Sequence, residues 1–86
     1  PKRVRTSWAE VDLILRRGNQ LFGVECKRAD APRMTPSIRI AMTDLQLSAV
    51  EVVYPGAKRY PLDEGVDAVP LATLAKAGSL FVRIAP

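Results

Sequence analysis

Residues 10–28, which read EVDLILRRGNQLFGVECKR, decide the fold of this chain. Apolar and polar side chains alternate along residues 8–15 and again along residues 20–28, the period-two pattern of a β-strand with one buried face. Between the two runs stand Gly18 and Asn19, residue types that adopt a left-handed backbone at low cost. The stretch therefore predicts an antiparallel β-hairpin.

The segment after the hairpin predicts a helix and then a strand. Thr35 and Pro36 are typical of a helix start, because threonine accepts an amide hydrogen bond and proline has no amide hydrogen to donate. Residues 48–54 are rich in valine and predict a third strand, which a crossover helix allows to pair in parallel with the second. The helix ends near Gln46 and presents one apolar face, made of Ile38, Ala41, Met42 and Leu45.

The last third of the chain predicts shorter elements. Residues 59–62 form an extended piece, residues 66–70 an edge strand because a proline ends them, and residues 70–76 two helical turns. The expected fold class is α/β, a small mixed sheet flanked by helices. We divide the chain into residues 1–5, a linker or cut terminus; residues 6–77, the domain; and residues 78–86, a C-terminal strand or tail.

Length and composition exclude several classes of protein for this chain. The 86 residues support one small domain, and 48% hydrophobic residues are typical of a folded one. A single cysteine excludes an internal disulfide, and the absence of histidine excludes a Cys/His zinc site and a histidine-based catalytic triad. No phosphate-binding Gly-x-x-x-x-Gly-Lys loop is present. No apolar run reaches membrane-span length, so we expect a cytoplasmic protein with no membrane partner.

Positive charge gathers toward the N-terminus. Residues 1–40 hold nine lysines and arginines against four acids, and residues 41–86 hold four against five. A basic region attracts the phosphates of nucleic acid, for which Arg28 and Arg39 are candidate contacts. An ordinary solvated surface is the alternative, and the spread of these arginines over several elements favours it.

Asp12, Glu25 and Lys27 form the candidate catalytic site. Strand alternation puts Glu25 and Lys27 on one face, and the hairpin brings Asp12 beside them. Neighbouring strands lie about 4.8 Å apart, so two carboxylates can share one Mg²⁺ ion, or Mn²⁺ as a substitute. The metal would acidify a bound water for phosphodiester cleavage, and the lysine would orient that water or neutralise developing charge. A cross-strand salt-bridge face without chemistry is the alternative.

The order of these segments resembles two related families. Asp12 followed by Glu25-Cys26-Lys27 resembles the PD-(D/E)xK nuclease superfamily, and the whole of residues 10–74 resembles the uncharacterised domain at the C-terminus of many prokaryotic AAA-type ATPases. The second resemblance is carried by residues 10–15, 24–27, 35–38, 52–56 and 60–62.

The resemblance implies a restriction-endonuclease-like fold with assigned site residues. Asp12 and Glu25 correspond to the metal-binding acids, the Cys26 carbonyl to a further ligand and Lys27 to the catalytic lysine. Two departures are visible: no proline precedes Asp12, and no helix with a further acid precedes the first strand. The Cys26 side chain is expected to be a small buried apolar group and not a nucleophile, because no histidine is present to activate the thiol.

Three functions are compatible with the sequence. The first is an Mg²⁺-dependent nuclease module that the N-terminal ATPase domain of a parent protein delivers to DNA or RNA. The second is a catalytically inactive module that binds nucleic acid or regulates that ATPase. The third is a protein-interaction domain that dimerises through Ile40 and an edge strand at residues 66–69.

Overall fold

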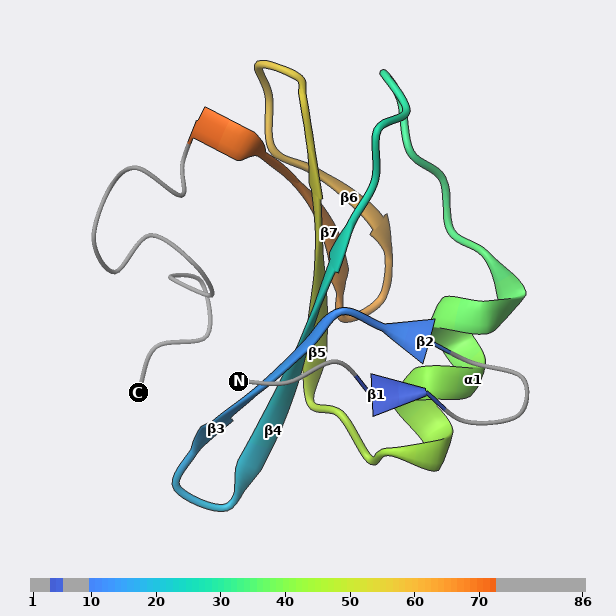
Figure 1. Ribbon diagram of the computed structural model, residues 1–86, viewed down its shortest axis with the longest axis vertical. Helices are drawn as coiled ribbons and strands as arrows, with labels where there is room; N and C mark the ends of the chain where they lie inside the picture. Colours follow the sequence, from blue (N-terminus) through green and yellow to red (C-terminus); the bar gives the residue numbers. More distant parts are fainter. Residues whose placement is uncertain (1–3, 6–9, 73–86) are drawn as a thin grey trace.

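The computed structural model describes residues 4–5 and 10–72, which form a five-stranded mixed sheet, one helix and a separate pair of short strands (Figure 1). The sheet order is β3-β4-β5-β7-β6, and β1 pairs with β2 beside the helix. In chain order the elements are β1 (Val4–Arg5), β2 (Glu10–Val11), β3 (Leu13–Arg17), β4 (Gln20–Cys26), α1 (Pro36–Asp44), β5 (Ala49–Tyr54), β6 (Tyr60–Asp63) and β7 (Val66–Pro70).

The hairpin and the crossover are confirmed. Strands β3 and β4 pair antiparallel, and the turn between them has Gly18 at a φ of 60°, a conformation that glycine adopts without strain. Helix α1 then carries the chain to β5, which pairs with β4 in parallel. The helix begins as predicted, because the Thr35 hydroxyl accepts a hydrogen bond from the Ile38 backbone nitrogen at 3.3 Å.

Two apolar cores lie on the two faces of the sheet. Strand β5 is buried along its whole length because it is central, and its side chains alternate between the cores. The predicted apolar face of α1 is confirmed, since Ile38 and Ala41 are fully buried while Met42 and Leu45 pack around them. The core beneath α1 comprises Ile38, Ala41, Leu47, Val50, Val52 and Val66, and the core on the opposite face comprises Phe22, Val24, Ala49 and Val53.

The prediction of an edge strand at residues 66–70 is wrong. Strand β7 lies between β5 and β6, and β6 is the edge. Pro70 is the last residue of β7, where its missing amide hydrogen interrupts no later part of the ladder. Ile40 is half-buried and packs against the core beneath α1. The proposed dimerisation surface therefore loses both of its components.

The predicted strand over residues 8–15 is interrupted at Asp12, which separates β2 from β3. Val4 and Arg5, within the expected linker, form β1 and pair with β2. Trp8, most of the helix expected at residues 70–76 and the strand or tail expected after residue 78 lie outside the described residues. Within the part of the chain that the structure describes, no helix has the length and apolar character needed to cross a membrane.

Candidate functional site

Asp12 lies at the break between β2 and β3, beside the end of β4. Its backbone nitrogen donates to the Val24 carbonyl oxygen at 3.1 Å, which extends the β3–β4 ladder by one residue. Its Oδ2 atom accepts a hydrogen bond from the Cys26 backbone nitrogen at 2.8 Å. An ionised acceptor makes such a hydrogen bond strong, so the Asp12 carboxylate is held at the end of β4.

Glu25 and Lys27 come together as strand alternation predicts. The Lys27 Nζ atom lies 3.5 Å from Glu25 Oε2. The Glu25 side chain is only 10% exposed, whereas that of Lys27 is 37% exposed. The other Glu25 oxygen, Oε1, is buried and has no hydrogen-bond partner among the residues that the structure describes. A buried acceptor without a partner is costly, so this oxygen is suited to binding a cation or a donor.

The protonation of Glu25 reflects this environment. Burial raises the pKa of the Glu25 carboxyl above its ordinary value of 4.5, and the neighbouring Asp12 carboxylate raises it further. The Lys27 ammonium acts in the opposite direction but does not cancel these effects. The Glu25 carboxyl therefore lies beside a second carboxyl group and is only partly neutralised by Lys27. A divalent cation would favour the ionised form of both.

The donor set fits a hard divalent cation. Asp12 and Glu25 supply carboxylate oxygens, the ligand type that Mg²⁺ prefers. In an extended strand the N–H and C=O groups of one residue point to the same side. Because the Cys26 nitrogen faces Asp12, the Cys26 carbonyl is directed to that side as well. Among the described residues no group of three or more Asp, Glu or Cys side chains is placed to hold a metal ion, so water would complete the coordination shell.

The Cys26 side chain is not buried, contrary to the prediction. It lies on the opposite face of β4 from Glu25 and is exposed. Partial burial raises the pKa of the Cys26 thiol above 9.0, and the carboxylates of Asp12 and Glu25 add to the shift. A thiol with a raised pKa is a poor nucleophile at neutral pH. The residue therefore contributes its backbone, and not its sulfur, to the candidate site.

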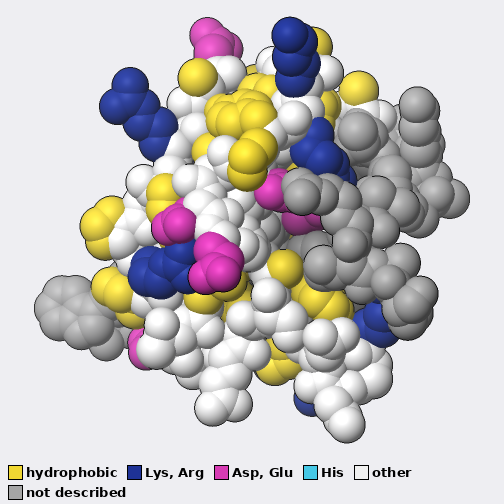
Figure 2. Space-filling view, turned by 180° about the vertical axis from the view of Figure 1, so that it is seen from behind, with side chains coloured by type: hydrophobic (Ala, Val, Ile, Leu, Met, Phe, Trp, Pro, Cys, Tyr) yellow, Lys and Arg dark blue, Asp and Glu magenta, His cyan; other side chains and the backbone are white. Residues whose placement is uncertain are grey.

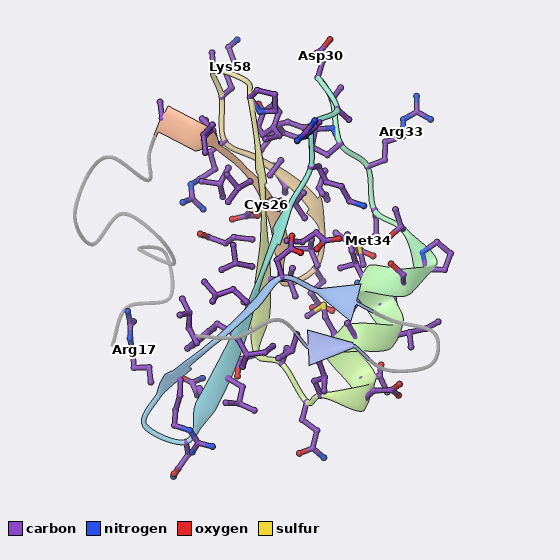
Figure 3. All side chains as sticks on the ribbon, viewed as in Figure 1. Arg17, Cys26, Asp30, Arg33, Met34 and Lys58 are labelled. Carbon is purple, nitrogen blue, oxygen red and sulfur yellow. The ribbon has the colours of Figure 1, made fainter. Side chains whose placement is uncertain are left out.

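The two predicted nucleic-acid contacts lie in different settings. Arg28 is exposed and follows the motif directly. Arg39, on α1, donates to Asp63 Oδ2 at 2.7 Å and so faces the end of β6. Other charged residues are dispersed: Arg17 lies at the hairpin end of the sheet, whereas Arg33 and Lys58 project from loops toward its other end (Figure 3). Figure 2 likewise shows separated basic side chains, some beside acidic ones, on the face it presents.

A second charged cluster, which the sequence did not reveal, lies on the face of the sheet opposite α1. Arg59 Nη1 contacts Glu51 Oε2 at 2.8 Å and Asp67 Oδ2 at 3.3 Å. Glu51 and Asp67 are direct neighbours in the β5–β7 register. The only signal in the sequence is a glutamate within a run of valines, which becomes informative once β5 and β7 are known to be adjacent.

A pair of tyrosines connects the loop after the motif to the sheet. The Tyr60 hydroxyl donates to the Pro32 carbonyl oxygen at 2.9 Å. The rings of Tyr54 and Tyr60 meet edge to face with centroids 5.7 Å apart. Tyr54 is buried. These contacts hold the segment between β4 and α1, which carries Arg28 and Arg33, against β6.

Comparisons with known proteins place the chain in a family. The model of a domain of unknown function, DUF4143, matches residues 4–74. An uncharacterised protein of Mycobacterium bovis is 40% identical over 72 residues, and an uncharacterised protein of Mycobacterium tuberculosis is equally similar. In each case the match covers 84% of this chain but only 16% of the relative's length. No solved structure has significant similarity to the chain.

Proposed function

The chain belongs to the DUF4143 family, and we propose that it is a nuclease-like module that hydrolyses phosphodiester bonds with Mg²⁺. The observation that carries the proposal is the buried Oε1 atom of Glu25, which has no hydrogen-bond partner among the described residues and lies beside the Asp12 carboxylate. The Lys27 ammonium lies 3.5 Å from the other Glu25 oxygen. When bound, Mg²⁺ would polarise a phosphoryl oxygen and lower the pKa of a coordinated water.

Each residue of the site has a task in this reaction. The Cys26 amide holds Asp12 in place, so that one acid is positioned before metal and substrate arrive. Glu25 supplies the second carboxylate, and its raised pKa makes metal binding compete with a proton. Lys27 is exposed enough to reach a phosphate while its ammonium stays near Glu25. It would stabilise the negative charge that develops at the phosphorus oxygens.

The strand order supports a restriction-endonuclease-like fold for this module. An antiparallel hairpin, a crossover helix and a parallel strand carry the Asp12 and Glu25-Cys26-Lys27 elements in the order of the superfamily that the sequence resembles. The relatives are several times longer than the matched region. We propose that the additional length of the parent protein includes an AAA-type ATPase domain, and that the whole protein is cytoplasmic and acts on DNA or RNA.

Mn²⁺ titration tests the metal site without a guess about substrate. Amide signals near Asp12, Glu25 and Cys26 should broaden at low Mn²⁺ concentrations, and Asp12→Asn/Glu25→Gln should weaken binding by more than about tenfold. Asp44→Asn, which removes an exposed acid at the end of α1, is the matched control and should bind as the unchanged chain does. Unlocalised broadening, or equal broadening in the double variant, would contradict the proposal.

Cleavage assays separate the role of Lys27 from metal binding. In Lys27→Met, hydrolysis of labelled DNA and RNA should fall by about 100-fold or more while Mn²⁺ binding is retained. Cleavage at the unchanged rate in this variant would remove Lys27 from the mechanism. A contaminating nuclease is recognised because its activity would persist in Asp12→Asn/Glu25→Gln.

A non-catalytic module is the second candidate, favoured by the pairing of Glu25 with Lys27 and by the small number of acids at the site. It predicts salt-sensitive binding of nucleic acid, or of the ATPase domain, that is unchanged by Mg²⁺. Fluorescence anisotropy with and without EDTA distinguishes the two candidates. Binding that is strengthened by Mg²⁺ in the unchanged chain and not in Asp12→Asn/Glu25→Gln favours the nuclease.

A further inference from the structure

A cavity of about 260 Å³ lies at the carboxyl ends of β4 and β5. It is lined by Cys26, Lys27, Arg28, Val53, Tyr54, Pro55 and Leu71. In sheets with adjacent parallel strands, ligands commonly bind outside the carboxyl ends of those strands. The position of the cavity is therefore suited to binding, and its lining shares Cys26 and Lys27 with the candidate metal site.

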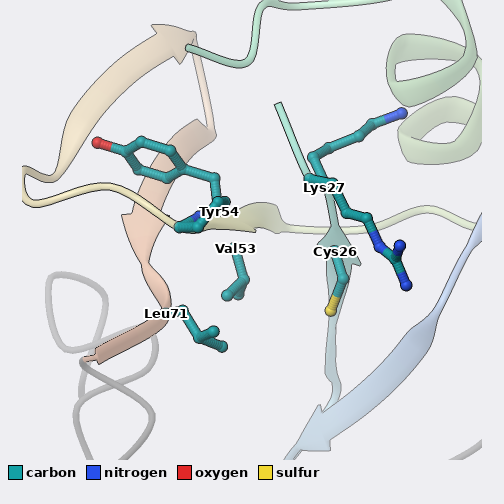
Figure 4. A pocket seen from close by; sticks show the side chains of 7 residues that line it. Cys26, Lys27, Val53, Tyr54 and Leu71 are labelled. Atoms are coloured by element: carbon teal, nitrogen blue, oxygen red, sulfur yellow. The ribbon is translucent and has the colours of Figure 1, made fainter. Parts of the chain in front are cut away.

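The walls of the cavity are apolar. Figure 4 shows Cys26, Val53 and Leu71 directed into the space on one side of the strands, whereas Tyr54 and Lys27 point to the other side. Leu71 is 53% exposed and is the one exposed large hydrophobic side chain in the part of the chain described. An exposed aliphatic side chain at the mouth of an apolar hollow favours a ligand with an apolar surface of its own.

The charged residues that line the cavity are basic. They are Lys27 and Arg28, and no acid is among the described residues of the lining. Arg28 is exposed, and no ion pair within the described residues engages its guanidinium. The Lys27 backbone borders the cavity while its ammonium lies beside Glu25. The complementary ligand is thus anionic at one end and apolar at the other.

We propose that this cavity holds one nucleobase of a nucleic-acid strand whose adjoining phosphate contacts Arg28. The volume lies just below the roughly 300–1,000 Å³ typical of pockets for drug-sized ligands. This size suits a single base and is too small for a helix of a partner protein. The cavity and the Glu25 side chain lie on opposite faces of β4, and Lys27 borders the cavity while its ammonium contacts Glu25, so a strand bound in this way would pass the end of β4 beside the candidate metal site. The inference rests on the proposed function and specifies single-stranded or locally unpaired nucleic acid as its substrate.

Alkylation of Cys26, the chain's single cysteine, reports on occupancy of the cavity directly. The full 86-residue chain is treated with iodoacetamide at a pH of about 8.5, because the raised pKa of the thiol slows the reaction at neutral pH. If dTMP binds with a Kd of about 1 mM, 10 mM dTMP should slow alkylation about tenfold. Inorganic phosphate at the same concentration should slow it less than about twofold, since it lacks the base. Equal protection by dTMP and phosphate, or protection by neither, overturns the proposal.

Two adjacent substitutions supply a matched pair. Leu71→Asp places a carboxylate at the cavity and should abolish protection by dTMP, whereas Ala72→Asp adds the same charge at an exposed neighbour outside the lining and should retain it. Both positions are exposed, so neither variant disturbs the core, and Leu71→Ala provides an uncharged second test. Full protection of both Leu71 variants by dTMP would contradict the assignment.

A further arm separates this inference from the proposed function. Protection by dTMP should persist in Asp12→Asn/Glu25→Gln, because neither carboxylate lines the cavity. If Mn²⁺ does not bind the unchanged chain while dTMP still protects Cys26, the metal site fails and the base pocket stands. If Mn²⁺ binds while dTMP gives no protection, the metal site stands and the base pocket is wrong.

Discussion

The sheet carries two clusters in which acids from neighbouring strand segments lie beside a cation, and the two clusters differ in how that cation contacts the acids and in how exposed it is. On the face opposite α1, Arg59 contacts both Glu51 and Asp67, at 2.8 and 3.3 Å. At the end of β4, Lys27 contacts Glu25 at 3.5 Å, and Asp12 accepts a hydrogen bond from the Cys26 backbone amide.

This difference separates a structural ion pair from a site with chemical capacity. The planar guanidinium of arginine reaches two carboxylates at once, whereas an ammonium on a flexible chain acts as a single point charge. One oxygen of Glu51 and one of Glu25 lack hydrogen-bond partners among the described residues. The pKa of Glu25 is raised, and its cation Lys27 is 37% exposed against 23% for Arg59, so Lys27 is the freer of the two to contact a substrate. We call Asp12, Glu25 and Lys27 the open cluster, and Glu51, Arg59 and Asp67 the closed cluster. The open cluster is therefore the candidate for metal binding.

The largest effect is expected from removing the cation of the closed cluster. Arg59→Met leaves the carboxylates of Glu51 and Asp67 without the cation that bridges them, which should lower the free energy of unfolding by about 3 kcal/mol. Urea unfolding measures the change, and Lys58→Met, at an exposed neighbour, is the control. Glu51→Gln/Arg59→Met should recover part of the loss, since one buried charge is removed. A loss below about 1 kcal/mol in the single variant would contradict the structural role of Arg59.

The corresponding change in the open cluster should affect stability much less. Lys27→Met removes a cation that is 37% exposed and contacts one acid, so the free energy of unfolding should change by less than about 1 kcal/mol. The same urea experiment measures it, in EDTA to remove metal. A loss as large as that of Arg59→Met would mean that the two clusters have the same structural role and would weaken the case for a site at Glu25.

The sequence alone was sufficient to group Asp12, Glu25 and Lys27. Strand alternation and a glycine turn determine which residues face one another in a hairpin, and both are local properties. The interruption of the strand at Asp12 was not predictable, because the hydrogen bond that its side chain makes there comes from the Cys26 amide, fourteen residues away. The exposure of Cys26 also escaped prediction, since it depends on what covers the end of β4 and not on the residue type.

The order of the strands in the sheet explains the other differences between the sequence predictions and the structure. Glu51 and Asp67 become neighbours only because β7 lies between β5 and β6, and the sequence separation gives no sign of that arrangement. The proline at the end of residues 66–70 favours an edge position, but it marks only the end of the strand. Local patterns thus predict elements and faces, whereas strand order and the contacts that it creates require the three-dimensional structure.

A comparably small effect, with a defined pH dependence, is expected at Glu25. Because the Glu25 pKa is raised on folding, this carboxyl stabilises the chain most at acid pH, and the contribution is lost as pH rises from about 4.5 through the folded pKa. Glu25→Gln should therefore be more stable than the unchanged chain at pH 7, by about 1 kcal/mol, and equally stable in acid. Urea unfolding in EDTA at several pH values tests this, with Glu64→Gln as an exposed control. Added Mg²⁺ should remove the advantage of the variant, and a variant that is less stable at pH 7 without metal would refute the interpretation.

The smallest effect is expected at a third acid–cation pair, Arg39 and Asp63, whose side chains are more exposed than those of the two clusters. The hydrogen bond from Arg39 lowers the pKa of Asp63 below its ordinary value of 3.8, with the Glu64 amide contributing further. The resulting stabilisation is present above pH 3.8 and is lost as pH falls through the folded pKa, the reverse of the behaviour at Glu25. Arg39→Gln should move the Asp63 pKa back toward its ordinary value, which carboxyl NMR titration measures, while unfolding at pH 7 changes little because solvent screens the pair. An unmoved Asp63 titration would show that the Glu64 amide alone holds this carboxylate. In that case Arg39 would be free to bind phosphate, as the sequence predicted for it.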